Sequence, residues 1–325
     1  MSQPPPPEPP YPGWDPAQPP PGTGQWGPPG YPPSWGAGQP PGWGAAHPPG
    51  WGGWVDPHDP LVPPPHAGLN GWSERLIGVI RRSWRTLLPI VLLTQFLPAL
   101  VIGVASLAAP TVPTDPAAGQ GLPDLGDLFA FVAGLIVLSL AIGVVSSVGW
   151  AAGTWALARQ AAGEPVGVPA ALRYGLSRGV GLWAWTLLVS LLVVAGLCAC
   201  LLPGIYLAFA LSLVGPVYLF ERGNPIGRAF QIFHGSLGLV LGRVALLALI
   251  VVGGAVLIEL VTSGLGLALG VGQGLTVGAV LVTIVSTLVA SPLYLVQLVG
   301  LVTTYAEWRG RQGPVGTGQL VAELG

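Results

Sequence analysis

Long apolar stretches alternate with short charged ones along the chain after residue 72. A helix needs about 20 apolar residues to cross the roughly 30 Å hydrocarbon core of a bilayer. The pattern predicts six spans, which are Leu87–Ala109, Leu128–Trp150, Val180–Leu202, Ile205–Phe220, Val244–Ser263 and Leu275–Val302. The third and fourth spans form one uncharged run that is too long for a single crossing, so we predict a hairpin with its turn at Pro203 and Gly204. The fold class is therefore expected to be all-α, a six-helix transmembrane bundle of three hairpins.

The placement of arginine supports the same six spans. Only 8% of the residues are charged, 51% are hydrophobic, and all 12 basic residues are arginine. Cytoplasmic loops retain arginine, whereas translocated loops do not. Six spans with both termini inside place every arginine on the inner side, namely Arg75, Arg81, Arg82, Arg85, Arg159, Arg173, Arg178, Arg222, Arg228, Arg243, Arg309 and Arg311. We therefore expect a multi-pass protein of the plasma membrane with cytoplasmic N- and C-termini.

The net charge of −1 argues against nucleic acid as a partner, because phosphate binding needs clustered positive charge.

A short amphipathic segment precedes each predicted hairpin. The three segments are "SERLIGVIRRSW" from Ser73, "PAALRYGLSRG" from Pro169 and "NPIGRAFQIFHGS" from Asn224. Each is expected to form a short helix in the plane of the membrane interface. The predicted interfacial anchors are Arg82, Trp84, Arg178, Arg228, Phe230, Phe233 and His234. No carboxylate, serine or cysteine forms an obvious catalytic pair with His234, so interfacial packing is predicted for it in preference to chemistry.

Composition divides the chain into three parts. Residues 1–70 are rich in Pro, Gly and Trp, which cannot sustain a helix or a sheet, and are expected to be a disordered cytosolic tail. Residues 71–310 form the six-span membrane domain, and residues 311–325 a short cytosolic C-terminal tail. Two interpretations of the N-terminal tail are open. It is either a docking segment for a cytosolic protein, because polyproline II segments bind aromatic grooves, or a simple tether.

Few carboxylate or amide side chains fall inside the predicted spans. Glu259, Gln95 and Gln297 are the candidates for an intramembrane polar path. An intramembrane acid suggests a proton or solute site, but Glu259 also lies near enough to the outer interface to reach water or a hydroxyl. Glycines recur every four residues from Gly266 to Gly278, which indicates either a packing face, and thus a possible homo-oligomer, or a flexible loop.

The segment "LLPGIYLAFALSLVGPVYLFE" followed by "NPIGRAFQIFHGSLGLVLGR" carries a family resemblance. Residues from about 72 to 309 resemble the membrane domain associated with bacterial glycerophosphoryl diester phosphodiesterases, and related actinobacterial membrane proteins with Pro-rich tails. Phe209 and "IFHGS" stand where that family often has a basic residue and an Arg-Ser-Trp-like element. The resemblance implies a membrane domain and carries no catalytic signature.

The sequence predicts a non-enzymatic role. After the tail the chain offers one histidine and few acids, and none is spaced as a metal site, so no metal, cofactor or hydrolase centre is expected. The predicted function is a membrane anchor or scaffold whose Pro-rich tail docks cytosolic partners and whose spans contact membrane lipids. The alternative is a carrier for a lipid or small amphipathic solute, and the third possibility is an intramembrane enzyme.

Overall fold

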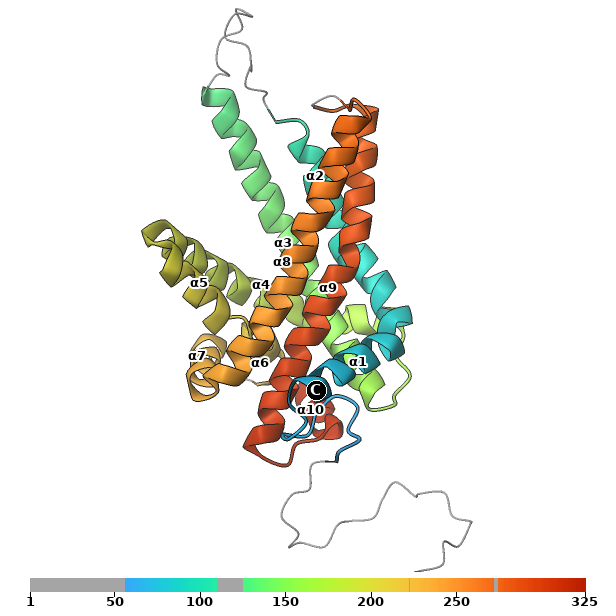
Figure 1. Ribbon diagram of the computed structural model, residues 1–325, viewed down its shortest axis with the longest axis vertical. Coiled ribbons are helices and arrows are strands. Elements are labelled where there is room, and N and C mark those ends of the chain that lie inside the picture. Colours follow the sequence, from blue (N-terminus) through green and yellow to red (C-terminus); the bar gives the residue numbers. More distant parts are fainter. Residues whose placement is uncertain (1–55, 110–124, 222, 272–273) are drawn as a thin grey trace, which may run out of the picture. The chain divides into compact units, whose positions relative to one another are not determined.

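Among the residues that the structure describes, six helical segments are long and apolar enough to cross a membrane, which confirms the all-α, six-span prediction. The computed structural model describes residues 56–109, 125–221, 223–271 and 274–325 (Figure 1), and these contain helices and no strand. The N-terminal residues 1–55, for which disorder is predicted, lie outside the described residues. The spanning segments are α1 (Gly68–Val91) with η1 (Leu92–Phe96) and α2 (Leu97–Ser106), α3 (Leu125–Ala161), α4 (Val168–Ala199), α5 (Leu201–Ala210) with α6 (Val214–Phe220), α8 (Leu237–Ala268) and α9 (Val277–Gln312).

Helix pairs build the membrane domain. α3 packs along α4, α8 packs along α9, and α1 lies against both α3 and α9. Figure 1 shows α8 and α9 side by side in orange and red. We call the end at which α1, α4 and α8 begin and α3 and α9 finish the charged end, because most of the ion pairs described below lie there. The opposite end is the far end.

Proline breaks regular hydrogen bonding in the first span. Pro98 has no N–H, so the carbonyl of Thr94, four residues earlier, loses its helical donor. The chain widens into the π-helical turn η1 at this point, and the Ser146 hydroxyl of α3 donates to the Thr94 carbonyl instead, at 3.4 Å. Pro292 inside α9 has the same effect on Leu288, whose carbonyl accepts from the Ser291 hydroxyl at 2.8 Å.

The turn between the third and fourth spans differs from the prediction. The corner is Cys200, which has an extended backbone (φ −170°, ψ 150°), and α5 already includes Pro203 and Gly204. Proline is accommodated in a first helical turn because its missing N–H has no intrahelical partner there. Gly204 instead permits a close approach, since a Cβ at this residue would lie 2.7 Å from the Leu197 nitrogen.

Only one of the three predicted interfacial helices is a separate helix. α7 (Pro225–Gly235) starts at an Asn224 cap, whose side chain accepts from the N–H of Ile226 at 3.1 Å and of Gly227 at 3.3 Å. The segments that begin at Ser73 and Pro169 are instead continuous with the spans that follow, as parts of α1 and α4. Pro89 follows the first segment but lies inside α1, and no proline ends the second segment, so each helix propagates into the apolar run.

Both predicted tails include packed residues. Asp59 accepts hydrogen bonds from the N–H of Thr317 (2.8 Å) and from its hydroxyl, at the start of the C-terminal helix α10 (Thr317–Leu324). Leu61 and Val62 are fully buried, and so is Leu320 of α10. Residues 56–70 and 311–325 therefore pack onto the charged end, and the boundaries at residues 70 and 310 do not separate tails from a membrane domain there.

Candidate functional site: a hydroxyl-lined cleft beside a broken helix

The crossing of α3 and α4 defines where the cleft begins. Gly175 and Gly179, one turn apart on α4, sit directly against the backbone of Val148 on α3. A Cβ on Gly179 would lie 2.9 Å from the Val148 Cα, and one on Gly175 would overlap the Val148 carbonyl oxygen. Glycines at this spacing let two helices approach closely. Further toward the far end the cleft opens between the same two helices.

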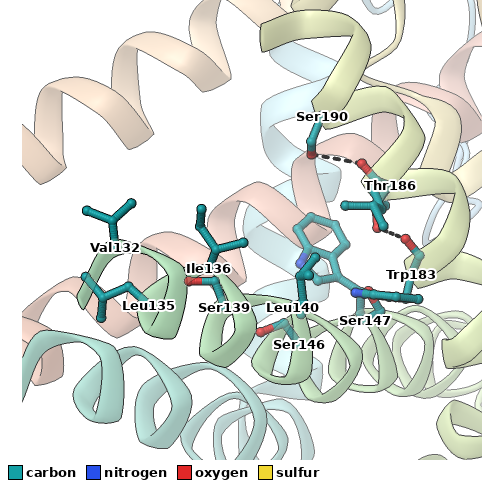
Figure 2. Close-up of a pocket in the computed structure, with 13 residues that line it drawn as sticks. Val132, Leu135, Ile136, Ser139, Leu140, Ser146, Ser147, Trp183, Thr186 and Ser190 are labelled. Carbon is teal, nitrogen blue, oxygen red and sulfur yellow. Dashed lines mark hydrogen bonds between the residues drawn. The ribbon is translucent and has the colours of Figure 1, made fainter. Parts of the chain in front are cut away.

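Two adjoining lobes form the cleft. The first has a volume of about 550 Å³ and lies between α3 and α4, and the second, of about 540 Å³, extends to α6 and α9. The residues that line both lobes are Ser147, Trp150, Thr186 and Ser190. Figure 2 shows the first lobe, with the row from Val132 to Ser147 on α3 facing the row from Trp183 to Ser190 on α4. Each lobe is in the range typical of small-molecule sites.

The lining combines apolar side chains with isolated hydroxyls and no charge. Hydroxyl groups come from three segments, and they are Ser139, Ser146 and Ser147 on α3, Thr186 and Ser190 on α4, and Ser212 between α5 and α6. None of the residues lining either lobe is Asp, Glu, Arg, Lys or His. The cleft is open at its side, because the lining residues Val132, Ile136 and Val194 are exposed.

Several of these hydroxyls already donate to the backbone. Thr186 donates to the Trp183 carbonyl at 3.0 Å, Ser190 to the Thr186 carbonyl at 2.8 Å, and Ser212 to the Phe209 carbonyl at 2.8 Å. The first two bonds are the dashed lines in Figure 2. A hydroxyl has one donor and two acceptor lone pairs. With their protons committed, these oxygens present acceptors to the cleft.

A break in the fourth span forms part of the wall. α5 ends at Ala210 and α6 starts at Val214, with Leu211 and Leu213 near ψ 4° between them. Pro216 cannot supply the helical donor for the Ser212 carbonyl four residues earlier. Leu211, Ser212 and Pro216 all line the second lobe. Non-helical backbone at membrane depth occurs where it is buried in protein or lines a cavity.

The three residues of the predicted polar path lie apart. Gln297 lines the second lobe, and no described residue hydrogen bonds to its amide. Gln95 is buried beside Gly149 and donates to the Ser146 carbonyl at 2.9 Å, which joins the first span to α3. Glu259 lines a different cleft, between α2, α8 and α9. The structure therefore does not connect the three into one path.

The predicted interfacial anchors fall into two groups, one on α1 and α4 and one on α7. Arg82 and Trp84 are exposed on α1, with the Arg85 guanidinium 5.6 Å from the Trp84 ring centre, and Arg178 is half-buried on α4. Interfacial placement of these three stays a prediction.

The anchors on α7 contact other parts of the protein, and their interfacial placement also stays a prediction. Phe233 is buried and meets the Tyr206 ring of α5 edge-on, with ring centres 5.9 Å apart, and Phe230 also contacts that ring. His234 contacts the Phe230 carbonyl through Nδ1 (2.8 Å) and the Tyr206 hydroxyl through Nε2 (3.0 Å). In the neutral ring Nδ1 must donate, because a carbonyl only accepts, and Nε2 then accepts from Tyr206. His234 thus joins α7 to α5.

The structure contains an ion-pair network at the charged end that was not predicted from the sequence. Glu307 of α9 is 1% exposed. Its carboxylate accepts hydrogen bonds from Nε and Nη2 of Arg243, both at 3.1 Å, and from Nη2 of Arg311 at 3.0 Å. Glu221 accepts from Arg228 at 2.7 Å and from the Tyr305 hydroxyl at 2.9 Å. In the sequence "TTYAEWRGR", Glu307 precedes Arg311 by four residues, a spacing that pairs opposite charges on a helix. This spacing could have indicated part of the network. The network links α6, α7, α8 and α9.

The fold and these sites define a multi-pass α-helical membrane protein. Within the described part of the chain, no group of three or more His, Cys, Asp or Glu side chains is placed to hold a metal ion. Comparisons with family models, with curated proteins and with solved structures found no match. The family resemblance of the sequence stays a prediction.

Proposed function

We propose that the protein binds an amphipathic, lipid-like molecule with an uncharged polar head in the cleft beside α3 and α4, and acts as its carrier. The observation that carries this proposal is the row of hydroxyls in an otherwise apolar cleft that is uncharged and open at its side. A polar head would hydrogen bond to Thr186, Ser190 and the Gln297 amide, while an apolar chain would lie along α3. Entry from the bilayer requires no charged group to cross hydrocarbon.

The broken span favours a carrier over an inert bundle. Discontinuous helices form substrate sites near the membrane midplane in several transporter folds, where their free backbone groups face the ligand. Here the Ser212 carbonyl has lost its helical donor at the wall of the cleft. An enzyme is not favoured, because the hydroxyls in the cleft have no neighbouring base among the lining residues.

Filling the cleft is the direct test. Ser190 is exposed and lines both lobes, so we expect Ser190→Phe to block binding with little effect on folding. The probe is a monoacylglycerol with a diazirine in its acyl chain, crosslinked to the full chain in lipid nanodiscs and mapped by peptide mass spectrometry. Labelling should concentrate on residues 132–150 and 183–194 and should fall at least tenfold in Ser190→Phe.

The matched control is Ser177→Phe on the same helix. Ser177 is also exposed and donates to the Tyr174 carbonyl at 2.7 Å, but it lines neither lobe. Labelling should stay at the wild-type level in this variant. Even labelling around all six spans, or equal loss in both variants, would reject the cleft as a binding site.

A docking role for the N-terminal segment is a second proposal. It is supported by the hydrogen bond of Asp59 to Thr317 at the start of α10 and by the burial of Leu61 and Val62, which fix the chain at the charged end just after the Pro- and Trp-rich segment. The scaffold hypothesis, the plasma membrane location and the cytoplasmic side of this end all belong to this proposal.

Truncation tests the docking role, and the structure sets where to cut. A chain that lacks residues 1–55 keeps Asp59, Leu61 and Val62, whereas a cut at residue 68 would remove buried contacts. We expect a copurifying cytosolic protein to be lost with residues 1–55 and to bind a synthetic peptide of residues 25–54. The same proteins copurifying with both chains would contradict docking and leave the segment as a tether.

A further inference from the structure

A second cleft lies far from the charged end and contains a carboxylate. Its volume is about 580 Å³, and it is formed by α2, α8 and α9. Glu259 of α8 lies 16 residues beyond Arg243, which corresponds to about 24 Å along the helix at 1.5 Å per residue. None of the residues that line this cleft also lines the cleft beside α3 and α4.

The carboxylate has no basic partner at this end. No Arg, Lys or His lines the cleft, and the loop sequences 110–124 and 269–276 contain none either. Within the described residues, the Glu259 carboxylate receives a single hydrogen bond, from the Ser263 hydroxyl to Oε1 at 3.1 Å. A carboxylate in or near hydrocarbon is costly unless it is paired or protonated. A cation must therefore come from outside the chain if the group is to be charged.

Hydroxyl oxygens line the same cleft as the carboxylate and are additional acceptors. Three helices supply these hydroxyls, which are Ser106 on α2, Thr262 and Ser263 on α8, and Thr283, Ser286 and Thr287 on α9. Apart from Ser263, each donates its proton to a carbonyl of its own helix, at distances from 2.7 to 3.1 Å. Their lone pairs remain for a ligand that only donates.

We propose that this cleft binds the primary ammonium group of an amphipathic amine. An ammonium group has three N–H donors and no acceptor, which matches a carboxylate in a cleft lined by hydroxyl oxygens. One carboxylate balances one positive charge. The cleft volume and the apolar side chains Leu107, Leu267 and Val282 leave room for a hydrocarbon portion beside the charged head. This inference does not depend on the cleft beside α3 and α4.

A fluorescent amine tests the proposal directly. Dansylcadaverine carries a primary ammonium group and an environment-sensitive fluorophore, and its binding to the full chain in nanodiscs of uncharged lipid is measured by titration. We expect saturable binding that weakens at least tenfold in Glu259→Gln, because the substitution keeps the shape of the side chain and removes its charge. Glu164→Gln is the matched control, since Glu164 pairs with Arg159 at 2.8 Å at the charged end, and should bind as the wild type does.

Competition with the wild-type protein provides a measurement that needs no variant. Dodecylamine should displace the probe, whereas dodecanol, which has the same chain without the charge, should not. A different outcome is displacement of the probe by sodium or potassium chloride but not by a bulky organic salt at the same ionic strength. That result would contradict an amine site and identify a site for a metal cation. Equal binding to wild type and Glu259→Gln, or equal competition by the alcohol, would overturn the site itself. Ser190→Phe should leave dansylcadaverine binding unchanged, so failure of one cleft is distinguishable from failure of the other.

Discussion

Gly175→Ala is expected to separate α3 from α4 and to destabilise the folded protein by about 3 kcal/mol or more, at the upper end of the cost of overpacking. The new methyl group would overlap the Val148 carbonyl oxygen, and a backbone atom cannot rotate away as a side chain can. The Ala152 Cβ, 3.0 Å from the same position, blocks a small sideways shift. The measurement is thermal unfolding of the detergent-solubilised protein, followed by loss of the monodisperse peak in size-exclusion chromatography.

Gly134→Ala is the matched control for this prediction. Gly134 lies on α3 as well, but a Cβ there would meet no atom within 4 Å. Alanine costs less conformational entropy than glycine in a helix, by roughly 0.5–1 kcal/mol, so this variant should be as stable as the wild type or slightly more stable. If both alanine variants unfolded at the wild-type temperature, the contact of α3 with α4 at Gly175 would not be as close as the structure has it.

The spans were predictable because each depends on one local property. In hydrocarbon, a run of about twenty apolar residues can pair all its backbone N–H and C=O groups within the segment only by forming a helix, whatever its neighbours are. The predicted third span, Val180–Leu202, thus coincides with most of α4 and ends three residues beyond it, although α4 begins earlier, at Val168, and includes Arg173 and Arg178. Where the prediction failed, the outcome depended on proline in context. Pro203 looked like a turn but sits in the first turn of α5, whereas Pro216 accompanies the break between α5 and α6.

The candidate site was less predictable because it depends on contacts between distant segments. Serine and threonine are scattered through the apolar runs, and nothing in the sequence marks Thr186 and Ser212 as lining one cleft. Glu259 was identified by its charge alone, but the hydroxyls that line the same cleft come from three helices. The glycines from Gly266 to Gly278 were ambiguous for the same reason. In the structure Gly270 and Gly274 have positive φ values of 64° and 85° between α8 and α9, which favours the loop interpretation over a continuous helical seam.

Glu307→Ala is expected to be the most destabilising change at the charged end. The substitution removes the carboxylate that accepts two hydrogen bonds from Arg243, whose side chain is only 12% exposed, and one from Arg311. The Arg243 charge would remain in place beneath the Trp72 ring, 5.8 Å from its centre, without its carboxylate. Breaking a buried pair by removing one partner costs about 3–5 kcal/mol, because the other charge is left uncompensated. Thermal unfolding in detergent at one fixed heating rate measures the loss.

A double substitution tests whether the unpaired Arg243 charge and the lost side-chain volume account for this loss. If the unpaired arginine causes the damage, the double variant with Arg243→Met and Glu307→Leu should recover much of the stability, since apolar residues of similar volume often replace a buried ion pair without loss. Glu164→Ala gives the surface comparison, because Glu164 and Arg159 are 44% and 30% exposed and such pairs contribute at most about 1 kcal/mol. Equal losses in Glu307→Ala and in the double variant would mean that neither the unpaired Arg243 charge nor the lost volume causes the damage, because the double variant removes the one and restores the other. The hydrogen bonds of the Glu307 carboxylate would then hold α8 against α9.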